Sequence, residues 1–560
     1  AGKITSIKDS QNHGISVLYN SQGVITSIAD WAGRSVKYGY DTQGNLISVS
    51  DPIGAITRYE YDLNNKLTKI INRAGQTILE NTYAPEAKIA SQKDASGTVV
   101  NFTYDEQTKI VSAVDNNGRT GRILYDDKAR VLENTDPLNG VIKYTYGNEY
   151  APLTISDKKG NKLTYTYDAN GNPTSVTLPT SKKITYEYNG TNFLTRILDG
   201  RYGLTSKETK LTYDPKFNLT QLSEAERLTN YTYDTSGEIA TLTNPLNQKT
   251  TWTRNSFGNP LAILDHLNNT TSYEYDILAR LTKTTDGEGK IVSFSYDQNN
   301  NVIARTDGSG TYNYQYDSEN RLQKEVKPNA AVTEYSYSAA GGIGSVKDAL
   351  NNITSYGYDG YLNLISQKDA LNRTTSYAYD KLNRNTLETT TLGNASKWEY
   401  DANGNITKRT DANNNSTVYT YDSLNRLTKI TYPNATSLSY TYDDRNNLTK
   451  ITDSVGTTSF TYDTFDRLTK TTNPFSKSVT YAYDNADNLT KITYPDSRSV
   501  SYTYDGLNRL ITVSDWNSGK TNYVYKKNGL VASKILPNGV VSNYTYDNAN
   551  QLISLVYEKL

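Results

Sequence analysis

The 560-residue chain contains no cysteine and no methionine, and it has only two histidines. Without cysteine it forms no disulfides and no thiolate metal sites. The absence of both readily oxidised sulfur residues is compatible with an extracellular location, where oxidised cysteine and methionine are not repaired. Because the chain also begins with Ala1, we expect it to be a processed piece or a portion of a longer protein.

Net charge is missing as well. Lysine plus arginine and aspartate plus glutamate both number 59, and no basic run interrupts this balance. A neutral chain has no field that draws it toward nucleic acid or an anionic membrane. No apolar stretch approaches the roughly 20 residues that cross a bilayer. We therefore expect neither a nucleic-acid partner nor a membrane span.

Phenylalanine is scarce compared with tyrosine. The chain has 8 phenylalanines and 49 tyrosines, and only 36% of its residues are hydrophobic. A core without water would use phenylalanine, leucine and isoleucine. Tyrosine has an apolar ring and a polar hydroxyl, so it suits a surface that is partly exposed to water. The composition therefore predicts a thin structure with much of its aromatic surface close to water.

Long helical stripes are also absent, because glycine, asparagine, threonine and tyrosine recur too often for them. What the chain has instead is a repeated phrase, "YTYDSLNRLTKIT" from Tyr419 and "YTYDDRNNLTKIT" from Tyr440. Between residues 380 and 505 the aspartates of successive copies lie 20 or 21 residues apart. Degenerate copies fill the remaining gaps, which gives about 26 units. We predict one continuous repeat array over residues 1–560, with no linker.

Each unit reads as a two-stranded hairpin. The first strand, Thr436–Asp443, is rich in β-branched and aromatic residues, and Tyr440 and Tyr442 share one of its faces. The aspartate bonds the amides just ahead of it, and a glycine or asparagine three residues later takes the left-handed conformation. A second strand such as Leu427–Thr431 follows, and it ends in a turn such as "DPIG" at Asp51. The predicted fold class is all-β: a repetitive antiparallel β-hairpin ribbon with about 21 residues per unit.

A ribbon of about 52 strands does not stay flat, because twist accumulates from strand to strand. It must coil. Closure into a single ring and winding into a tighter spiral or tube both satisfy this requirement.

The phrase YxYDxxNRLTKIT closely resembles the YD repeats of the RHS/YD-repeat family, over nearly the whole chain. The resemblance implies a ribbon that spirals into a hollow shell, as in insecticidal toxin complexes, bacterial RHS toxins and teneurins. Toxin members enclose a cytotoxic C-terminal segment. The chain lacks the "GRF" and "DP" core of toxin members, so no self-cleaving residue is assigned. The resemblance implies structural signature positions at Tyr419, Tyr421, Asp422, Asn425, Leu427, Tyr440, Tyr442, Asp443, Tyr502, Tyr504 and Asp505.

Signals for chemistry are weak. His13 and His266 lie far apart in the sequence, and phosphate-binding and dinucleotide-binding motifs are absent. The recurring aspartates raise the alternative of calcium binding. However, equivalent residues of neighbouring units should lie about 9.6 Å apart, too far for two carboxylates to share one ion. We predict turn capping for these aspartates, and no catalytic residue, metal or cofactor.

Three features leave alternatives open. The tyrosines either pack against neighbouring strands or offer platforms for sugars. The sequons either carry surface glycans or arise from turn asparagines followed by strand threonines. The stretch Leu198–Lys210 exceeds the repeat period by four residues. We expect a longer loop there. Its extra length is either an accident of drift in the repeat sequence or marks a contact with a partner or a neighbouring turn of the spiral. The sequons singled out are at Asn218, Asn352, Asn434, Asn447 and Asn488.

The preferred functional hypothesis is a non-catalytic, secreted scaffold that forms a hollow shell around a polypeptide cargo, such as a toxic C-terminal segment. The alternative is a repeat-built filament, tube or adhesin of the cell surface, without cargo. An enzyme on a repeat scaffold would need paired carboxylates that depart from the consensus, and none is found. The expected partners are other repeat segments of the same or neighbouring chains, an enclosed polypeptide, and surface glycans.

Overall fold

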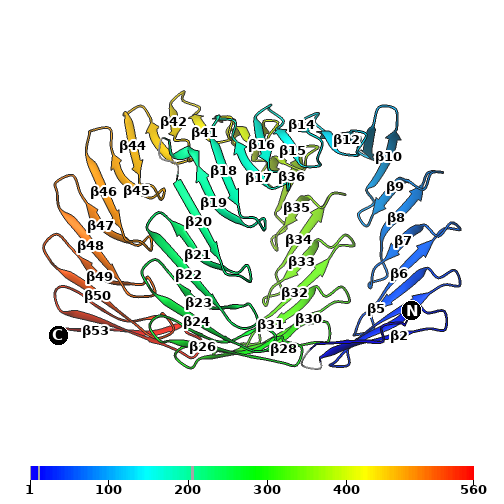
Figure 1. The fold of residues 1–560 in the computed structure, drawn as a ribbon, viewed down its shortest axis with the longest axis horizontal. Coiled ribbons are helices and arrows are strands. Elements are labelled where there is room, and N and C mark those ends of the chain that lie inside the picture. The colour runs from blue at the N-terminus through cyan, green and yellow to red at the C-terminus, as the bar shows by residue number, and fades with distance from the viewer. Residues whose placement is uncertain (1, 10–12, 204–206, 560) are drawn as a thin grey trace. The chain divides into compact units, whose positions relative to one another are not determined.

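The computed structural model describes residues 2–9, 13–203 and 207–559, which Figure 1 draws as a ribbon. They form 53 β-strands and one short 3₁₀-helix, η1 (Gly200–Tyr202), without any α-helix in these ranges. The described part of the chain thus holds no helix that is long and apolar enough to cross a membrane. The predicted all-β class, with two strands per repeat, is confirmed.

The strands are short, mostly of five or six residues, and follow one another at regular intervals. The first eighteen are β1 (Ser6–Lys8), β2 (Gly14–Tyr19), β3 (Ile25–Asp30), β4 (Ser35–Tyr40), β5 (Leu46–Ser50), β6 (Ile56–Tyr61), β7 (Leu67–Ile71), β8 (Thr77–Tyr83), β9 (Ile89–Asp94), β10 (Val99–Asp105), β11 (Ile110–Asp115), β12 (Thr120–Tyr125), β13 (Val131–Thr135), β14 (Val141–Tyr146), β15 (Pro152–Ser156), β16 (Lys162–Tyr167), β17 (Pro173–Thr177) and β18 (Lys183–Tyr188). The next eighteen are β19 (Leu194–Asp199), β20 (Lys207–Tyr213), β21 (Leu219–Glu224), β22 (Arg227–Tyr233), β23 (Ile239–Thr243), β24 (Lys249–Arg254), β25 (Pro260–Leu264), β26 (Thr270–Tyr275), β27 (Leu281–Thr285), β28 (Ile291–Tyr296), β29 (Val302–Asp307), β30 (Gly310–Tyr316), β31 (Leu322–Val326), β32 (Val332–Tyr337), β33 (Ile343–Lys347), β34 (Ile353–Tyr358), β35 (Leu364–Lys368) and β36 (Thr374–Tyr379). The last seventeen are β37 (Asn385–Thr389), β38 (Ala395–Tyr400), β39 (Ile406–Thr410), β40 (Ser416–Tyr421), β41 (Leu427–Thr431), β42 (Ser437–Tyr442), β43 (Leu448–Thr452), β44 (Thr457–Tyr462), β45 (Leu468–Thr472), β46 (Ser478–Tyr483), β47 (Leu489–Thr493), β48 (Ser499–Tyr504), β49 (Leu510–Ser514), β50 (Lys520–Tyr525), β51 (Val531–Ile535), β52 (Val540–Tyr546) and β53 (Leu552–Lys559).

One repeat shows why the phrase folds as a hairpin. β-branched and aromatic residues fill β40 and β41, which pair antiparallel with a register shift between Thr420 and Tyr421. The Asn425 amide donates to the Asp422 carbonyl, and the Asp422 amide donates to the Arg426 carbonyl, both at 3.0 Å. With Asn425 at φ 59°, this is a three-residue loop that ends in a left-handed residue and a bulge. We call each turn that follows the YxYD phrase a YD turn.

A second kind of turn joins one hairpin to the next, and we call it a return turn. In the return turn Asp369–Arg373, the Asn372 amide donates to the Asp369 carbonyl at 2.9 Å. Asn372 has φ 62°, so the loop closes as the YD turn does. It pairs β35 with β36 in antiparallel register. YD turns therefore line one edge of the ribbon and return turns line the other. Strands β42 to β50, coloured yellow to red in Figure 1, follow this pattern hairpin after hairpin.

The ribbon has almost no dry core. Val17 and Val500 are the only buried hydrophobic residues among those described. Most strand side chains are half-buried, and the tyrosines are among them. This agrees with the thin, tyrosine-rich structure that the composition predicts. Stability must then come from strand pairing and from polar contacts along the two edges.

Contacts divide the chain into two compact units. The first consists of Ala1–Val141, Tyr275–Thr282 and Ser293–Trp398, and the second of Ile142–Glu274, Lys283–Val292 and Glu399–Leu560. The single array over residues 1–560 stays a prediction.

Each unit contains two layers of ribbon that come from distant parts of the sequence. In the first unit, hydrogen bonds join residues 244 to 266 positions apart. In the second unit the separations run from 239 to 264. In both, return turns of the earlier layer contact YD turns of the later layer. A ring of a single turn would bring no two layers into contact, so it describes neither unit.

Candidate functional site: the repeat turns and the seams between layers

The two tyrosines of the phrase lie on one face of their strand. Tyr419 and Tyr421 are half-buried in β40, and Thr420 between them is exposed. The Tyr421 hydroxyl donates a hydrogen bond of 2.9 Å to the carbonyl of Ile406, in the preceding hairpin. The second tyrosine thus bonds each hairpin to the one before it. Tyr440 and Tyr502 are half-buried like Tyr419, and the bond recurs from Tyr442 to Leu427 (2.9 Å) and from Tyr504 to Leu489 (2.8 Å).

The aspartate that follows organises the YD turn. Asp422 Oδ1 accepts hydrogen bonds from the amides of Leu424, at 2.9 Å, and Arg426, at 3.0 Å. Its Oδ2 accepts from Arg426 Nε at 2.7 Å. One carboxylate therefore caps the turn and holds the fifth turn residue. Asp443 and Asp505 accept the equivalent pairs of amides in their own turns.

Asn425 and Leu427 complete the predicted unit. The left-handed Asn425 accepts hydrogen bonds from the side chains of Asn403 and Asn405, at 3.0 and 2.9 Å, in the preceding YD turn. Leu427 begins β41 opposite Tyr421, and its carbonyl accepts the hydroxyl of Tyr442. These contacts run along the ribbon, because each joins one repeat to its neighbour.

Arginine at the fifth position of the turn extends the same connection. The Arg426 guanidinium lies 4.8 Å from the centre of the Tyr442 ring, and its Nη1 donates to the Asp443 carbonyl at 2.8 Å. A guanidinium over an aromatic face is attracted by the ring quadrupole. Arg426 therefore contacts its own turn and the next hairpin at once.

Ionisation in the turn is set by these contacts. Burial alone would raise the pKa of Asp422, but hydrogen bonds from the Arg426 amide and guanidinium outweigh it and hold the pKa below its ordinary value. The pKa of Asp505 is lowered in the same way by Arg509. Burial raises the pKa of the Tyr421 hydroxyl. At neutral pH the turn thus keeps a charged acceptor, and the strand keeps a protonated donor.

The two layers of the first unit meet at a seam. The YD turn Asp359–Asn363 lies against the return turn Asp94–Thr98 of the earlier layer. The Gly360 carbonyl accepts hydrogen bonds from the hydroxyls of Thr98, at 2.6 Å, and Ser96, at 2.5 Å. Backbone of one layer is therefore bonded directly to side chains of the other.

The next return turn of the earlier layer, Asp115–Arg119, holds the other side of the same YD turn. The Tyr361 hydroxyl donates to the Asp115 carboxylate and accepts from Asn117 Nδ2 at 3.0 Å. The Arg119 guanidinium lies 3.6 Å from the centre of the Tyr361 ring. The tip of a YD turn thus sits between two neighbouring return turns, and we call such a space a socket.

The second unit repeats the arrangement. In the YD turn Asp463–Arg467, the Phe465 ring lies 3.6 Å from the Arg227 guanidinium, and Asp466 accepts the Tyr202 hydroxyl at 2.7 Å. Arg227 also pairs with Asp487 at 2.6 Å, and its side chain is only 10% exposed. Aromatic and charged side chains therefore fill this seam as they do in the first unit.

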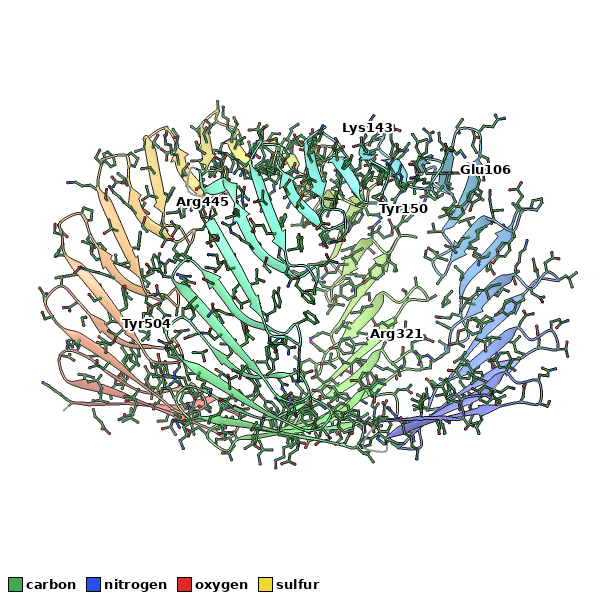
Figure 2. All side chains as sticks on the ribbon, viewed as in Figure 1. Glu106, Lys143, Tyr150, Arg321, Arg445 and Tyr504 are labelled. Atoms are coloured by element: carbon green, nitrogen blue, oxygen red, sulfur yellow. The ribbon has the colours of Figure 1, made fainter. Side chains whose placement is uncertain are left out.

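Tyr202 connects this socket to the irregular stretch of the sequence. It belongs to η1, inside the predicted longer loop Leu198–Lys210, of which residues 204–206 lie outside the described residues. The Arg445 guanidinium lies 4.7 Å from its ring centre. Burial, together with Asp466, raises the pKa of its hydroxyl. Figure 2 labels Arg445 at its turn and Tyr504 on β48. Of the two alternatives for this stretch, Tyr202 supports contact with a neighbouring layer.

The two histidines belong to different units and contact different residues. His13 Nδ1 lies 3.1 Å from Asp9 and its ring 5.3 Å from that of Trp31. His266 lies in a return turn of the second unit, against Gly506, where a Cβ atom would meet its ring at 2.1 Å. Within the described ranges, no group of three or more histidine, aspartate or glutamate side chains is arranged to hold a metal ion.

The five sequons differ in accessibility. Four asparagines donate their side-chain amides to the aspartate that begins their turn, at 2.9 to 3.1 Å: Asn218, Asn352, Asn447 and Asn488. Asn434 is exposed in a return turn, and its Oδ1 accepts the Thr436 hydroxyl at 2.7 Å. A glycan replaces one of the two hydrogens on the asparagine Nδ2. Asn447 and Asn488 use this nitrogen in two hydrogen bonds each, so a glycan there would break one of them.

Sequence patterns did not identify Tyr361 or Arg227 as seam residues. Tyr202, in contrast, lies in the stretch Leu198–Lys210, which its excess over the repeat period had singled out. The available signal was the presence of large aromatic and cationic residues at turn tips, where small polar residues suffice for the turn.

Comparisons with known proteins identify a family with the same repeats. The sequence matches the family model described as Teneurin YD-shell over residues 68–203, 260–397, 374–453 and 397–559, and the model described as RHS Repeat over residues 40–77. A search of the curated proteins finds no match.

Among the solved structures that are similar in fold are two toxin-complex structures. The chain aligns with TcdB2-TccC3-TEV at a TM-score of 0.66 and 14% identity, covering 98% of this chain and 39% of that one. It aligns with TcdB2-TccC3 at a TM-score of 0.67 and 14% identity, covering 98% and 37%. This chain therefore spans well under two thirds of the length of these relatives. At such identity the likeness concerns the fold alone.

The Teneurin YD-shell matches cover well over half of the chain, and they confirm the resemblance carried by the YxYD phrase. The chain belongs to the Teneurin YD-shell family.

Proposed function

We propose that this protein is a non-catalytic, secreted scaffold whose ribbon forms the wall of a hollow shell around a polypeptide cargo. Its repeats and fold are those of a shell-forming scaffold. The observation that carries the proposal is the seam between layers in each unit. A ribbon that inserts the tips of one edge into sockets of the other edge makes a continuous wall, whereas a fibre of single ribbon would leave both edges free.

The chemistry of the repeat supports a structural role for the predicted signature residues. Asp422 is occupied by turn amides and by Arg426. Tyr421 is occupied by a backbone carbonyl of the neighbouring hairpin. Groups committed in this way stabilise turns and junctions, and they are not free to act as acids, bases or nucleophiles.

The cargo is inferred from the family. Toxin members of the RHS group enclose a cytotoxic C-terminal segment, and the solved relatives are more than twice as long as this chain. The enclosed polypeptide is therefore proposed to come from the same gene or from a companion subunit. The other proposed partners are further repeat segments, and glycans attached at or bound near the exposed turns.

Protease protection of the particle from its native source tests this proposal. The intact particle is treated with a nonspecific protease, and a second sample is treated after the wall has been unfolded in urea. We expect a polypeptide without YD repeats to survive in the intact particle and to be degraded once the wall unfolds. The matched control is an unrelated unfolded protein added to the outside of the intact particle, which should be degraded in both samples.

Degradation at the same rate before and after unfolding would overturn enclosure, and so would the absence of any polypeptide beyond the repeats. If the particle then proves to be a long filament, the surface-fibre alternative replaces the shell.

A further inference from the structure

One face of the ribbon in the second unit carries a row of exposed lysines. In four successive hairpins, the third residue of the second strand is a lysine that pairs with the residue between the two aromatic residues of the phrase. Because paired residues share a face, these lysines lie on the face away from the tyrosines. We call them the lysine row, in β41, β43, β45 and β47 (Figure 1): Lys429, Lys450, Lys470 and Lys491.

The lysine row lacks the acidic partners that lysine has at the same position elsewhere in the ribbon. In four other hairpins the third residue of the second strand is a lysine within 2.8 to 3.7 Å of a glutamate: Lys69 with Glu60, Lys283 with Glu274, Lys324 with Glu334, and Lys408 with Glu399. In the row, threonine or alanine replaces that glutamate on the first strand. Among residues 2–9, 13–203 and 207–559, no carboxylate pairs with a lysine of the row.

The four charges form a line. Successive lysines of the row lie two strands apart, which is about 9.6 Å, so the row extends roughly 29 Å along the ribbon. On this face of β40 to β49, within residues 416–514, the other strand residues are serine, threonine, alanine and valine, and none is acidic. The whole chain is neutral, so the row is a local excess of positive charge. Its shape fits a linear polymer with regularly spaced anionic groups.

The residues beside the row indicate which kind of polymer fits. On its other side, each lysine pairs with a serine or threonine whose hydroxyl has no hydrogen-bond partner in the described part of the chain: Ser439, Ser459, Thr480 and Ser501. A hydroxyl donates and accepts, so it suits the hydroxyls of a sugar. The strand residues of this face from β40 to β49 include no aromatic ring on which a base could stack and no arginine to grip a phosphate with two hydrogen bonds. An acidic peptide would find no free strand edge on a sheet face.

We propose that the lysine row binds a linear acidic polysaccharide, with carboxylates of the polymer on the lysine ammonium groups and its hydroxyls on the serines and threonines beside them. Each exposed charge contact is weak and is screened by salt. A polymer that contacts all four lysines at once gains affinity from the linkage between its sugars. This binding requires no enclosed polypeptide, so its absence would leave the proposed shell unaffected.

Two charge-matched variants of the full-length protein test the proposal. The first replaces every lysine of the row by glutamine, and the second does the same to the four lysines that have glutamate partners. Both lose four positive charges from the same repeat position, and urea unfolding checks that both are folded. Affinity for fluorescent polygalacturonate is measured by anisotropy on assembled particles. The row variant is Lys429→Gln, Lys450→Gln, Lys470→Gln and Lys491→Gln, and the control is Lys69→Gln, Lys283→Gln, Lys324→Gln and Lys408→Gln.

We expect the unmodified particle to bind polygalacturonate in a salt-dependent manner and not to bind neutral dextran. The row variant should lose at least about tenfold in affinity, and the control variant should change little. No binding by the unmodified particle, or equal losses in the two variants, would overturn the site. Stronger competition by polyglutamate or duplex DNA of equal charge than by unlabelled polygalacturonate would overturn the polysaccharide as partner.

Carbodiimide coupling locates the polymer without any substitution, because it joins carboxylates to amines that they contact. The unmodified particle is coupled to bound polygalacturonate, and the modified peptides are identified by mass spectrometry after the polymer is trimmed with a pectinase. We expect coupling at the lysine row several-fold above that at Lys69, Lys283, Lys324 and Lys408. Equal coupling at the two sets would contradict the proposal even if the row variant fails to fold.

Discussion

The hydroxyl of Tyr361 donates a hydrogen bond to the carboxylate of Asp115, although 246 residues separate the two in the chain. Each residue belongs to a turn that its own repeat would form without the other. The bond therefore adds nothing to the hairpins and serves only to join two layers of the first unit. Local turn chemistry and long-range layer contacts are thus carried by different residues of the same short repeat.

Replacement of Tyr421 by phenylalanine removes the bond to Ile406 and keeps the ring. The free energy of unfolding should fall by about 1 kcal/mol, the usual net value of one hydrogen bond. Tyr419→Phe is the matched control, since it alters the neighbouring tyrosine on the same face. Urea unfolding measures the free energy of unfolding of both variants, and hydrogen exchange of β39 and β40 provides a local readout. Equal losses for the two variants would contradict the role given to Tyr421.

Replacement of Asp422 by alanine leaves two turn amides without their acceptor, and we expect a loss of about 1–3 kcal/mol. Asp422→Asn should cost less, because asparagine begins the turn Asn244–Gln248 and accepts the same two amides there. Ser423→Ala, in the same turn, should have little effect. The urea midpoints of the three variants give the order of their stabilities. An equal loss of stability for the asparagine and alanine variants would contradict turn capping and indicate that only the charge of Asp422 matters.

Acid should weaken the repeat array. The pKa values of Asp422, Asp463 and Asp505 lie below the ordinary value in the folded protein. Their contribution to stability is therefore fully present above the unfolded pKa, about 3.9, and is lost as the pH falls through the folded pKa. Urea midpoints measured from pH 7 to pH 2 should hold steady and then drop below about pH 4.

The control for the acid experiment is the double variant Asp422→Asn and Asp505→Asn. It should be less stable at neutral pH and should lose less stability in acid. A wild-type midpoint that stays level or rises below the ordinary aspartate pKa would refute this explanation.

Replacement of Arg227 by alanine should open a seam without unfolding hairpins. The variant loses the contact with Phe465 and leaves Asp487 without its 2.6 Å partner. Hydrogen exchange should rise in the YD turns Asp463–Arg467 and Asp484–Asn488, while β42 and β43 keep their protection. Arg227→Lys should rescue this only in part, since lysine does not stack on a ring as a planar guanidinium does. The control is Lys210→Ala, because Lys210 is an exposed ion-pair partner of Glu208. A uniform loss of protection in the Arg227 variant would show that Arg227 stabilises the hairpins themselves.

The repeat unit could be predicted because its causes are local. Asp422, Asn425 and the alternating tyrosines act within a few residues of their own positions, so the turn and the two strands follow from the phrase. The bond from Tyr421 to Ile406 went unpredicted, although the excess of tyrosine over phenylalanine was a sign that the hydroxyls are used. The number of repeats per layer depends on small changes of twist and curvature at every hairpin. No single residue encodes it, so the pairing of Tyr361 with Asp115 could not be read from the sequence.

Electron microscopy of the particle from its native source tests the central claim most directly. If the ribbon is the wall of a shell, the particles are closed hollow bodies of uniform size, with density for a polypeptide inside. Long uniform filaments or open tubes without internal density would contradict the shell and make this protein a structural fibre subunit.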